Sequence, residues 1–222
     1  YLYIKDGDTV WNPGWQPTKT ELDSYECRHG IGYSRFTSSK NGVKASVLSF
    51  VPLNDNCEIS QLTLTNGSSE DKKLSVFSYV EWCLWNADDD MKNFQRNLST
   101  GEVEVQDSTI YHKTEYRERR NHYAIYSVNT KIDGFDTSRD AFLGAYRGAD
   151  SPEAIENGKC TNSMASGWSP IASHQINVDL AAGETKTFIF VLGYIENPED
   201  EKWESYGVIN KTRAKEMLAK YQ

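Results

Sequence analysis

The feature that most constrains the fold is a two-residue alternation of apolar side chains in short segments separated by turn residues. Residues 174–180 alternate in this way, the Ala-Gly-Glu turn at 182–184 follows, and a second apolar segment runs through 187–192. Leucines alternate with threonines over 62–65, just before the turn pair Asn66-Gly67. Alternation of this kind predicts half-buried strands, and Asn-Gly favours a tight turn because both residues tolerate positive φ. Many short strands without a strand–helix rhythm predict an antiparallel β-sandwich.

Segment 74–85 differs because it carries apolar residues on both faces. One face would hold Leu74, Val76, Val80 and Trp82, and the other would hold Phe77, Tyr79, Cys83 and Trp85. A strand that is apolar on both faces is expected to be covered on both sides. We expect the opposite sheet to cover the first face and a neighbouring domain to cover the second.

The end of the chain changes character after residue 198, where charged residues replace the alternating pattern. From about residue 209, apolar residues recur near helical spacing, which predicts a helix. We therefore expect a sandwich domain over 1–198 and, over 199–222, the start of a helical linker to another domain. A helix that packs on the sandwich itself is the alternative. Because residues 1–4 already have the pattern of a strand, we also expect earlier strands to be missing from this sequence.

Composition excludes several classes of function. The net charge of -8, from 24 basic and 32 acidic residues, argues against a nucleic-acid partner. No apolar run approaches the roughly 20 residues of a membrane span, and no secretory leader is visible. The four cysteines show no metal or disulfide spacing, which is typical of reduced thiols in a cytoplasmic protein. Aromatic residues make up 12% of the chain, which is compatible with sugar binding.

Few residues suggest catalysis. The chain has no nucleophile motif or phosphate-binding glycine loop, so no motif points to a catalytic residue. Its four histidines are scattered, so we predict no metal site. His174 lies on an apolar face and is interpreted as a core residue. The acidic run 88–90 is interpreted as a solvated turn or helix cap. The mixed-charge run 113–120 is expected to form a solvated edge strand or a salt-bridged interface to another domain.

The segment 82–97 is the best candidate for ligand binding. Two tryptophans lead into a loop rich in amides, with candidate side chains at Asn86, Asn93, Gln95 and Arg96. Amides and a guanidinium can form several hydrogen bonds to sugar hydroxyls, and aromatic rings can stack on the sugar. The alternative is a loop whose asparagines hold local turns.

Long runs of this chain resemble cellobiose phosphorylases of glycoside hydrolase family 94. The runs are 12–17 (NPGWQP), 22–30 (LDSYECRHG), 85–105 (including NFQRNLSTGEVEV), 111–120 (YHKTEYRERR) and 167–171 (GWSPI). The resemblance implies a large antiparallel two-sheet supersandwich followed by a linker helix. It also implies an α-helical barrel, absent from this sequence, that carries the general acid and the phosphate pocket.

The resemblance further implies an inverting phosphorolysis of cellobiose to α-glucose 1-phosphate and glucose. Inorganic phosphate is then a substrate, and no cofactor is required. By position, Arg96 would contact the glucose of the acceptor (+1) subsite, with Gln95, Asn93 and Asn86 near it. A homodimer is implied as well. A stand-alone carbohydrate-binding module and a purely structural dimerisation domain are the alternatives. The apolar face of Phe77, Tyr79, Cys83 and Trp85 is expected to be exposed in this chain alone, which argues against a free module.

Overall fold

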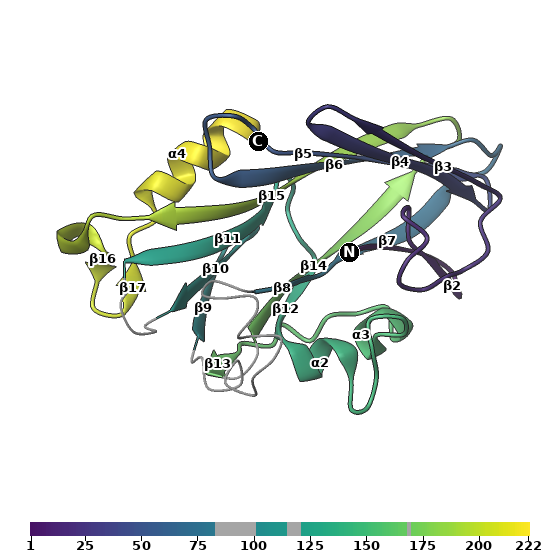
Figure 1. Ribbon diagram of the computed structural model, residues 1–222. Coiled ribbons are helices and arrows are strands. Elements are labelled where there is room, and N and C mark those ends of the chain that lie inside the picture. The colour runs from purple at the N-terminus through teal and green to yellow at the C-terminus, as the bar shows by residue number, and fades with distance from the viewer. Residues whose placement is uncertain (83–100, 115–120, 168–169) are drawn as a thin grey trace.

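The computed structural model describes residues 1–82, 101–114, 121–167 and 170–222. Two antiparallel sheets pack face to face, and the core lies between them (Figure 1). Every described pairing between strands is antiparallel, and an isolated parallel bridge joins Asp136 to Ser163. The predicted mainly-β sandwich is therefore confirmed.

The smaller sheet, within the described residues, has the order β12-β14-β7-β1-β2, and β8 also pairs with β14. Its strands are β1 (Leu2–Asp6), β2 (Thr9–Trp11), β7 (Lys72–Ser78), β8 (Val80–Glu81), β12 (Gly134–Ser138) and β14 (Pro170–Leu180). We call it the small sheet.

The second sheet, which we call the large sheet, has the order β13-β9-β10-β11-β15-β6-β5-β4-β3 in the described part of the chain. Its strands are β3 (Ser24–Gly30), β4 (Tyr33–Lys40), β5 (Val43–Phe50), β6 (Cys57–Asn66), β9 (Gly101–Gln106), β10 (Thr109–Thr114), β11 (His122–Val128), β13 (Ser166–Gly167) and β15 (Thr185–Glu196).

The predicted tight turn at Asn66-Gly67 is not formed, because neither residue has positive φ and the chain crosses here from β6 in the large sheet to β7 in the small sheet. The Asn66 side chain is fully buried and donates to the carbonyl oxygens of Glu70 and Leu180 at 2.7 and 3.0 Å. It also accepts a hydrogen bond from the Ser68 amide at 3.0 Å. One amide therefore joins the end of β6 in the large sheet to the end of β14 in the small sheet.

The two-faced segment 74–85 needs two corrections. It is not one strand, because β7 ends at Ser78 and β8 begins at Val80. The face of Phe77 and Tyr79 is covered by this chain itself, through α2 (Arg139–Leu143) and α3 (Glu153–Glu156). Phe77 is fully buried, and the Tyr79 ring stacks on Phe142 with centroids 5.1 Å apart. Cys83 and Trp85 lie outside the described residues.

The C-terminal helix α4 (Thr212–Tyr221) packs on the outer face of the large sheet (Figure 1). It begins later than predicted, because Ile209 belongs to a hairpin formed by β16 (Trp203–Ser205) and β17 (Val208–Ile209) after the 3₁₀ turn η2 (Glu199–Glu201). A Cβ at Gly193 would lie 3.0 Å from Met217 Sδ, so this glycine lets α4 approach the sheet closely. Whether α4 also starts a linker stays a prediction.

His174 is a core residue, as predicted. It is fully buried, its ring stacks on Tyr126 with centroids 5.0 Å apart, and its Nδ1 lies 3.2 Å from Ser78 Oγ. Burial lowers the pKa of His174 to about 3, so the ring is neutral at neutral pH.

Candidate functional site: the base of the amide-rich loop

The predicted sugar-binding residues Asn86, Asn93, Gln95 and Arg96 lie outside the described residues, as does the acidic run 88–90. Their role stays a prediction. The structure does describe the residues from which this segment starts and to which it returns. These residues form the base of the loop.

The base is built around His112 of β10. The Trp82 indole, which directly precedes residue 83, stacks on the His112 ring with centroids 5.3 Å apart and an angle of 10° between the planes. Gly101, which directly follows residue 100, lies against the same ring, because a Cβ there would be 2.0 Å from His112 Cε1. Both ends of the segment 83–100 are therefore held on one buried imidazole.

The electrostatics of this base follow from burial. His112 is 6% exposed, and burial, helped by the charge of His122, lowers the pKa of His112 to about 4. Its Nδ1 has no hydrogen-bond partner within the described residues. The ring is therefore neutral at neutral pH and supports the loop by packing.

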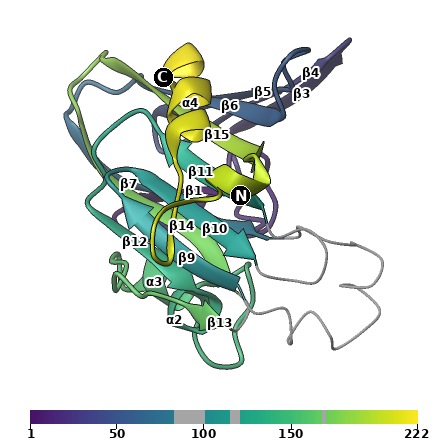
Figure 2. The ribbon, with the colours of Figure 1, turned by 90° about the vertical axis from the view of Figure 1, so that its left-hand side faces the viewer.

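Three ranges outside the described residues are flanked by residues that meet at one end of the large sheet. Gly101 pairs with Thr114 on one side and with Gly167 on the other. The ranges 83–100, 115–120 and 168–169 therefore all adjoin this end, as the positions of β9, β10 and β13 show in Figures 1 and 2. A ligand held by the predicted loop would approach the sandwich here.

A network of ion pairs ties β9, β10 and the C-terminal segment together beside this base. Lys113 Nζ lies 3.1 Å from Glu102 Oε2 and 3.1 Å from Glu104 Oε1. Lys211 Nζ lies 2.5 Å from Glu104 Oε2, and Glu104 Oε1 accepts a hydrogen bond from the Ile209 amide at 3.0 Å. Burial favours the neutral form of Glu104, but the hydrogen bonds from Lys211, the Ile209 amide and Lys113 outweigh it and lower its pKa.

The structure tests the interpretation of the run 113–120 at Lys113 and Thr114, because residues 115–120 lie outside the described residues. These two residues belong to β10, which is paired on both sides and is not an edge strand. The Lys113 side chain is 7% exposed, and its described ion pairs are within this chain. Sequence reasoning missed Glu104 and Lys211 because they are 107 residues apart.

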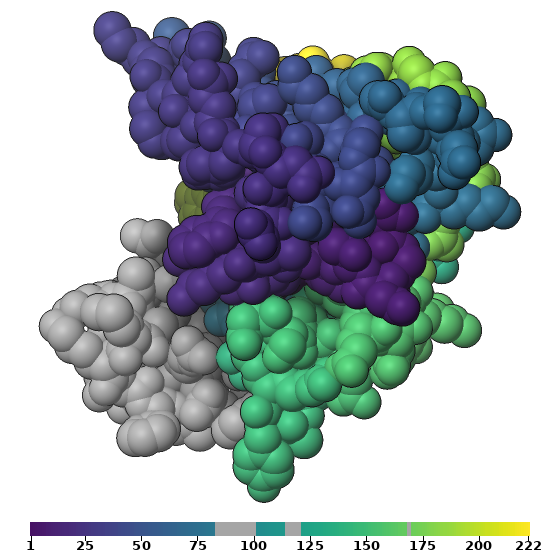
Figure 3. Space-filling model, turned by 90° about the vertical axis from the view of Figure 1, so that its right-hand side faces the viewer, coloured from purple at the N-terminus to yellow at the C-terminus, as the bar shows by residue number. Residues whose placement is uncertain are grey.

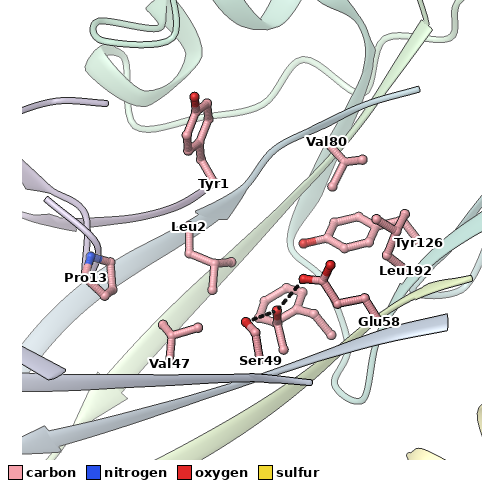
Figure 4. Close-up of a pocket in the computed structure, with 11 residues that line it drawn as sticks. Tyr1, Leu2, Pro13, Val47, Ser49, Glu58, Val80, Tyr126 and Leu192 are labelled. Atoms are coloured by element: carbon pink, nitrogen blue, oxygen red, sulfur yellow. Dashed lines mark hydrogen bonds between the residues drawn. The ribbon is translucent and has the colours of Figure 1, made fainter. Parts of the chain in front are cut away.

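A cleft of about 230 Å³ opens between the sheets (Figure 4). One wall carries a row of polar groups, in which Ser49 Oγ lies 2.9 Å from Ser60 Oγ and Ser60 Oγ lies 3.5 Å from Glu58 Oε1. Figure 4 shows the Tyr126 hydroxyl on the same side as the Glu58 carboxylate. The remaining lining is largely apolar, including Leu2, Val47, Val80, Phe190 and Leu192.

The lining of the cleft does not fit glycoside cleavage by water or by phosphate. Glu58 is the one carboxylate among the lining residues, whereas inverting hydrolysis uses two carboxyl groups on opposite sides of the bond. Phosphorolysis needs one acid, but the lining has no lysine, arginine or histidine to hold phosphate. Nothing in the sequence distinguished Glu58 and Ser60 from other polar residues that alternate along a strand.

No metal centre is formed by the described residues. Within them, no three His, Cys, Asp or Glu side chains come together closely enough to hold a metal ion. Among the cysteines that the structure describes, Cys57 and Cys160 are buried and Cys27 is partly exposed, and all three are free thiols. None of the described helices is long and apolar enough to cross a membrane.

These features define a class: a β-supersandwich domain in which residues 83–100 connect β8 of the small sheet to β9 of the large sheet. The chain belongs to glycosyl hydrolase family 94, because the sequence model described as "Glycosyl hydrolase 94, supersandwich domain" matches residues 1–222. The resemblance seen in the sequence is thereby confirmed at the level of the family.

Two curated relatives are similar over most of this chain. The N,N'-diacetylchitobiose phosphorylase of Vibrio furnissii is 30% identical over 228 residues, which cover 100% of this chain and 26% of that protein. The solabiose phosphorylase of Paenibacillus borealis is 32% identical over 208 residues, covering 90% of this chain and 26% of that protein. The chain thus spans about a quarter of the length of these relatives.

Solved structures show the same fold at low sequence identity. A putative kojibiose phosphorylase from the human microbiome has a TM-score of 0.56 and 11% identity, with 99% of this chain and 24% of that chain covered. A bacterial glucoamylase complexed with acarbose has a TM-score of 0.56 and 15% identity, with 88% of this chain and 26% of that chain covered.

Proposed function

We propose that this chain is the non-catalytic supersandwich domain of an inverting disaccharide phosphorylase, and that its loop 83–100 shapes the acceptor side of the active site. The observation that carries the proposal is the family match over residues 1–222, together with two relatives that are themselves disaccharide phosphorylases. The proposed reaction is cellobiose plus inorganic phosphate to α-glucose 1-phosphate and glucose, in the cytoplasm and without a cofactor.

The chemistry divides naturally between two domains. A carboxylic acid protonates the leaving glycosidic oxygen, and phosphate attacks the opposite face of the sugar, in place of the water of an inverting hydrolase. Phosphate is already a nucleophile, so a second carboxylate is not required as a base. The acid and the phosphate site would lie in the α-helical barrel, and the supersandwich would contribute to the acceptor subsite and to dimer contacts.

Arg96 is proposed to orient the acceptor glucose, with Gln95, Asn93 and Asn86 beside it. A planar guanidinium can bind two neighbouring hydroxyls at once, which fixes the orientation of a sugar ring. The contacts at the two ends of the loop support this role, because Trp82 stacks on the His112 ring and Gly101 lies against the same ring.

The test uses the complete phosphorylase in the synthetic direction. Because a hydrogen bond to a charged group contributes about 1.5–3 kcal/mol, R96A should raise the KM for glucose about 10- to 100-fold. The KM for glucose 1-phosphate should change little. R35A, which removes an exposed arginine of β4, is the matched control. An unchanged KM for glucose in R96A would remove the proposed subsite.

A stand-alone carbohydrate-binding module remains the second candidate. Because α2 and α3 cover Phe77 and Tyr79, these two residues no longer argue against a free module. The isolated 222-residue chain should neither release glucose 1-phosphate from cellobiose nor bind cellobiose measurably in calorimetry. Binding without turnover would favour the module instead, and turnover would contradict both readings.

A further inference from the structure

The two ends of the segment 83–100 belong to different sheets. Trp82 directly follows β8 of the small sheet, and Gly101 is the first residue of β9 in the large sheet. The position of one end relative to the other therefore depends on contacts that cross between the sheets. His112 of β10 makes such a contact, because its ring stacks on Trp82 and lies against Gly101.

Each end is also fixed within its own sheet. In the small sheet, β8 pairs with β14, and Arg139 Nε of α2 lies 3.0 Å from Glu81 Oε1. The segment that contains α2 and α3 forms the green surface in Figure 3. In the large sheet, Gly101 pairs with Thr114 on one side and with Gly167 on the other. Two fixed ends thus meet on one side chain.

The packing around His112 leaves no room for a larger ring. The planes of the His112 and Trp82 rings are 10° apart, with centroids 5.3 Å apart. On the side of Gly101, an added Cβ would lie 2.0 Å from His112 Cε1 and 2.9 Å from its Nδ1. Because protein interiors are closely packed, a larger side chain here must displace one of the two ends.

A comparison with His174 indicates that fold stability does not explain the imidazole at 112. Both rings are buried and stacked on an aromatic ring, but His174 Nδ1 lies 3.2 Å from Ser78 Oγ. Within the described residues, His112 Nδ1 and Trp82 Nε1 have no hydrogen-bond partner, and His174 leaves its Nε2 unpaired. A buried polar atom without a partner lowers stability. The place of His112 between the two ends of the segment gives it another role.

We infer that His112 is a positioning residue for the acceptor sugar: its ring fixes the two ends of the segment 83–100 relative to each other and thereby sets the acceptor affinity. This inference rests on the proposed function, in which Arg96 of the same segment binds the acceptor glucose. His112 acts through that segment and does not touch the sugar. A small displacement is sufficient, because moving a binding group by about 1 Å can cost about 100-fold in activity.

The kinetics of H112F in the complete phosphorylase test the inference in the synthetic direction. The larger phenyl ring should displace Gly101 and raise the KM for glucose about tenfold. The kcat at saturating glucose and the KM for glucose 1-phosphate should change less than about twofold. A merely structural role would reduce the amount of folded enzyme, and hence the apparent kcat, without changing the KM for glucose. A folded H112F enzyme with the wild-type KM for glucose would overturn the inference.

H174F is the matched control, because it also replaces a buried, stacked imidazole by a phenyl ring. His174 contacts Ser78 and Tyr126 and neither end of the segment. H174F should therefore leave the KM for glucose within about twofold of wild type. Equal increases in H112F and H174F would show a general loosening of the core and would contradict a specific role of His112.

G101A disturbs the same contact from the other side. Its added methyl group would press on the His112 ring, so the KM for glucose should rise in this variant too. If H112F does not fold, G101A provides the test, and a folded G101A enzyme with the wild-type KM for glucose then overturns the inference.

R96A separates this inference from the proposed function. If R96A raises the KM for glucose and neither H112F nor G101A does, positioning by His112 alone is wrong. If H112F and G101A raise it and R96A does not, the positioning is supported and the assignment of the acceptor contact to Arg96 is wrong. If none of the three variants changes it, both the acceptor role of the segment and the inference fail.

Discussion

Strands β11 and β3 are both seven residues long and belong to the same sheet, but they have opposite environments. All seven residues of β11 are buried, whereas six of the seven in β3 are exposed. β11 has α4 on one face, the small sheet on the other and a strand on each side. β3 lies at the edge of the sheet with β4 as its described neighbour. The sheet thus has an interior part that stabilises the domain and an exposed edge that should contribute little to its stability.

The comparison is tested most strongly by truncating one side chain in each strand. Ile125 of β11 is fully buried, so I125A should lower the free energy of unfolding by about 2–5 kcal/mol through lost burial and a cavity. Tyr25 of β3 is 49% exposed, so Y25A should change it by less than about 0.5 kcal/mol. Urea denaturation of the monomer measures both. Similar losses in the two variants would erase the distinction between the strands.

Ion pairs should differ in the same way. Glu104 accepts hydrogen bonds from Lys113, Lys211 and the Ile209 amide in a largely buried setting, so E104Q should destabilise the fold by about 3 kcal/mol. The pair of Glu26 and Arg28 is exposed, and E26Q should cost less than about 1 kcal/mol. Thermal or urea unfolding checks the difference. An equally small effect of E104Q would show that α4 is not anchored through this network.

Lowering the pH should destabilise the fold through the buried interior, because His174 lies there. The pKa of His174 is lowered to about 3 by burial, while an unfolded histidine has a pKa near 6.5. Between these two pKa values the unfolded chain therefore binds more protons than the folded chain. His174 leaves the free energy of unfolding unchanged above pH 6.5 and lowers it as the pH falls below 6.5.

His174 alone should account for about 2 kcal/mol of the stability lost between pH 7 and pH 5. H174F should reduce the measured loss by that amount, whereas H29Q on exposed β3 should leave it unchanged. An H174F protein with the wild-type pH dependence would show that His174 titrates normally in the fold.

Two glycines provide the finest comparison. A Cβ at Gly101 would lie 2.0 Å from the buried His112 ring, and one at Gly30 would lie 2.1 Å from the ring of Tyr33. Tyr33 is 45% exposed and can rotate away, but His112 is enclosed. G101A should therefore cost about 1–2 kcal/mol, and G30A less than about 0.5 kcal/mol. Denaturation curves check this, and equal costs would mean that the base of the loop can adapt.

The sequence predicts the sandwich well, because alternation is a local signal that is kept in strands such as β5 and β6. The core position of His174 was predictable for the same reason. The cover over Phe77 and Tyr79 was not, because α2 is only five residues and α3 only four residues long, too short for a clear helical period. The contacts of His112 with Trp82 and of Glu104 with Lys211 depend on pairings between distant segments, which no local pattern reveals. The loop residues Asn86, Asn93, Gln95 and Arg96 were identified through the family resemblance, and their role stays a prediction.

Hydrogen exchange followed by mass spectrometry tests the contrast between interior and edge most directly. In the 222-residue chain, the amides of β11 should be protected, because this strand is buried and paired on both sides. Amides of β3 that do not bond to β4 should exchange rapidly. Equal protection of every amide in the two strands would contradict the distinction between interior and edge.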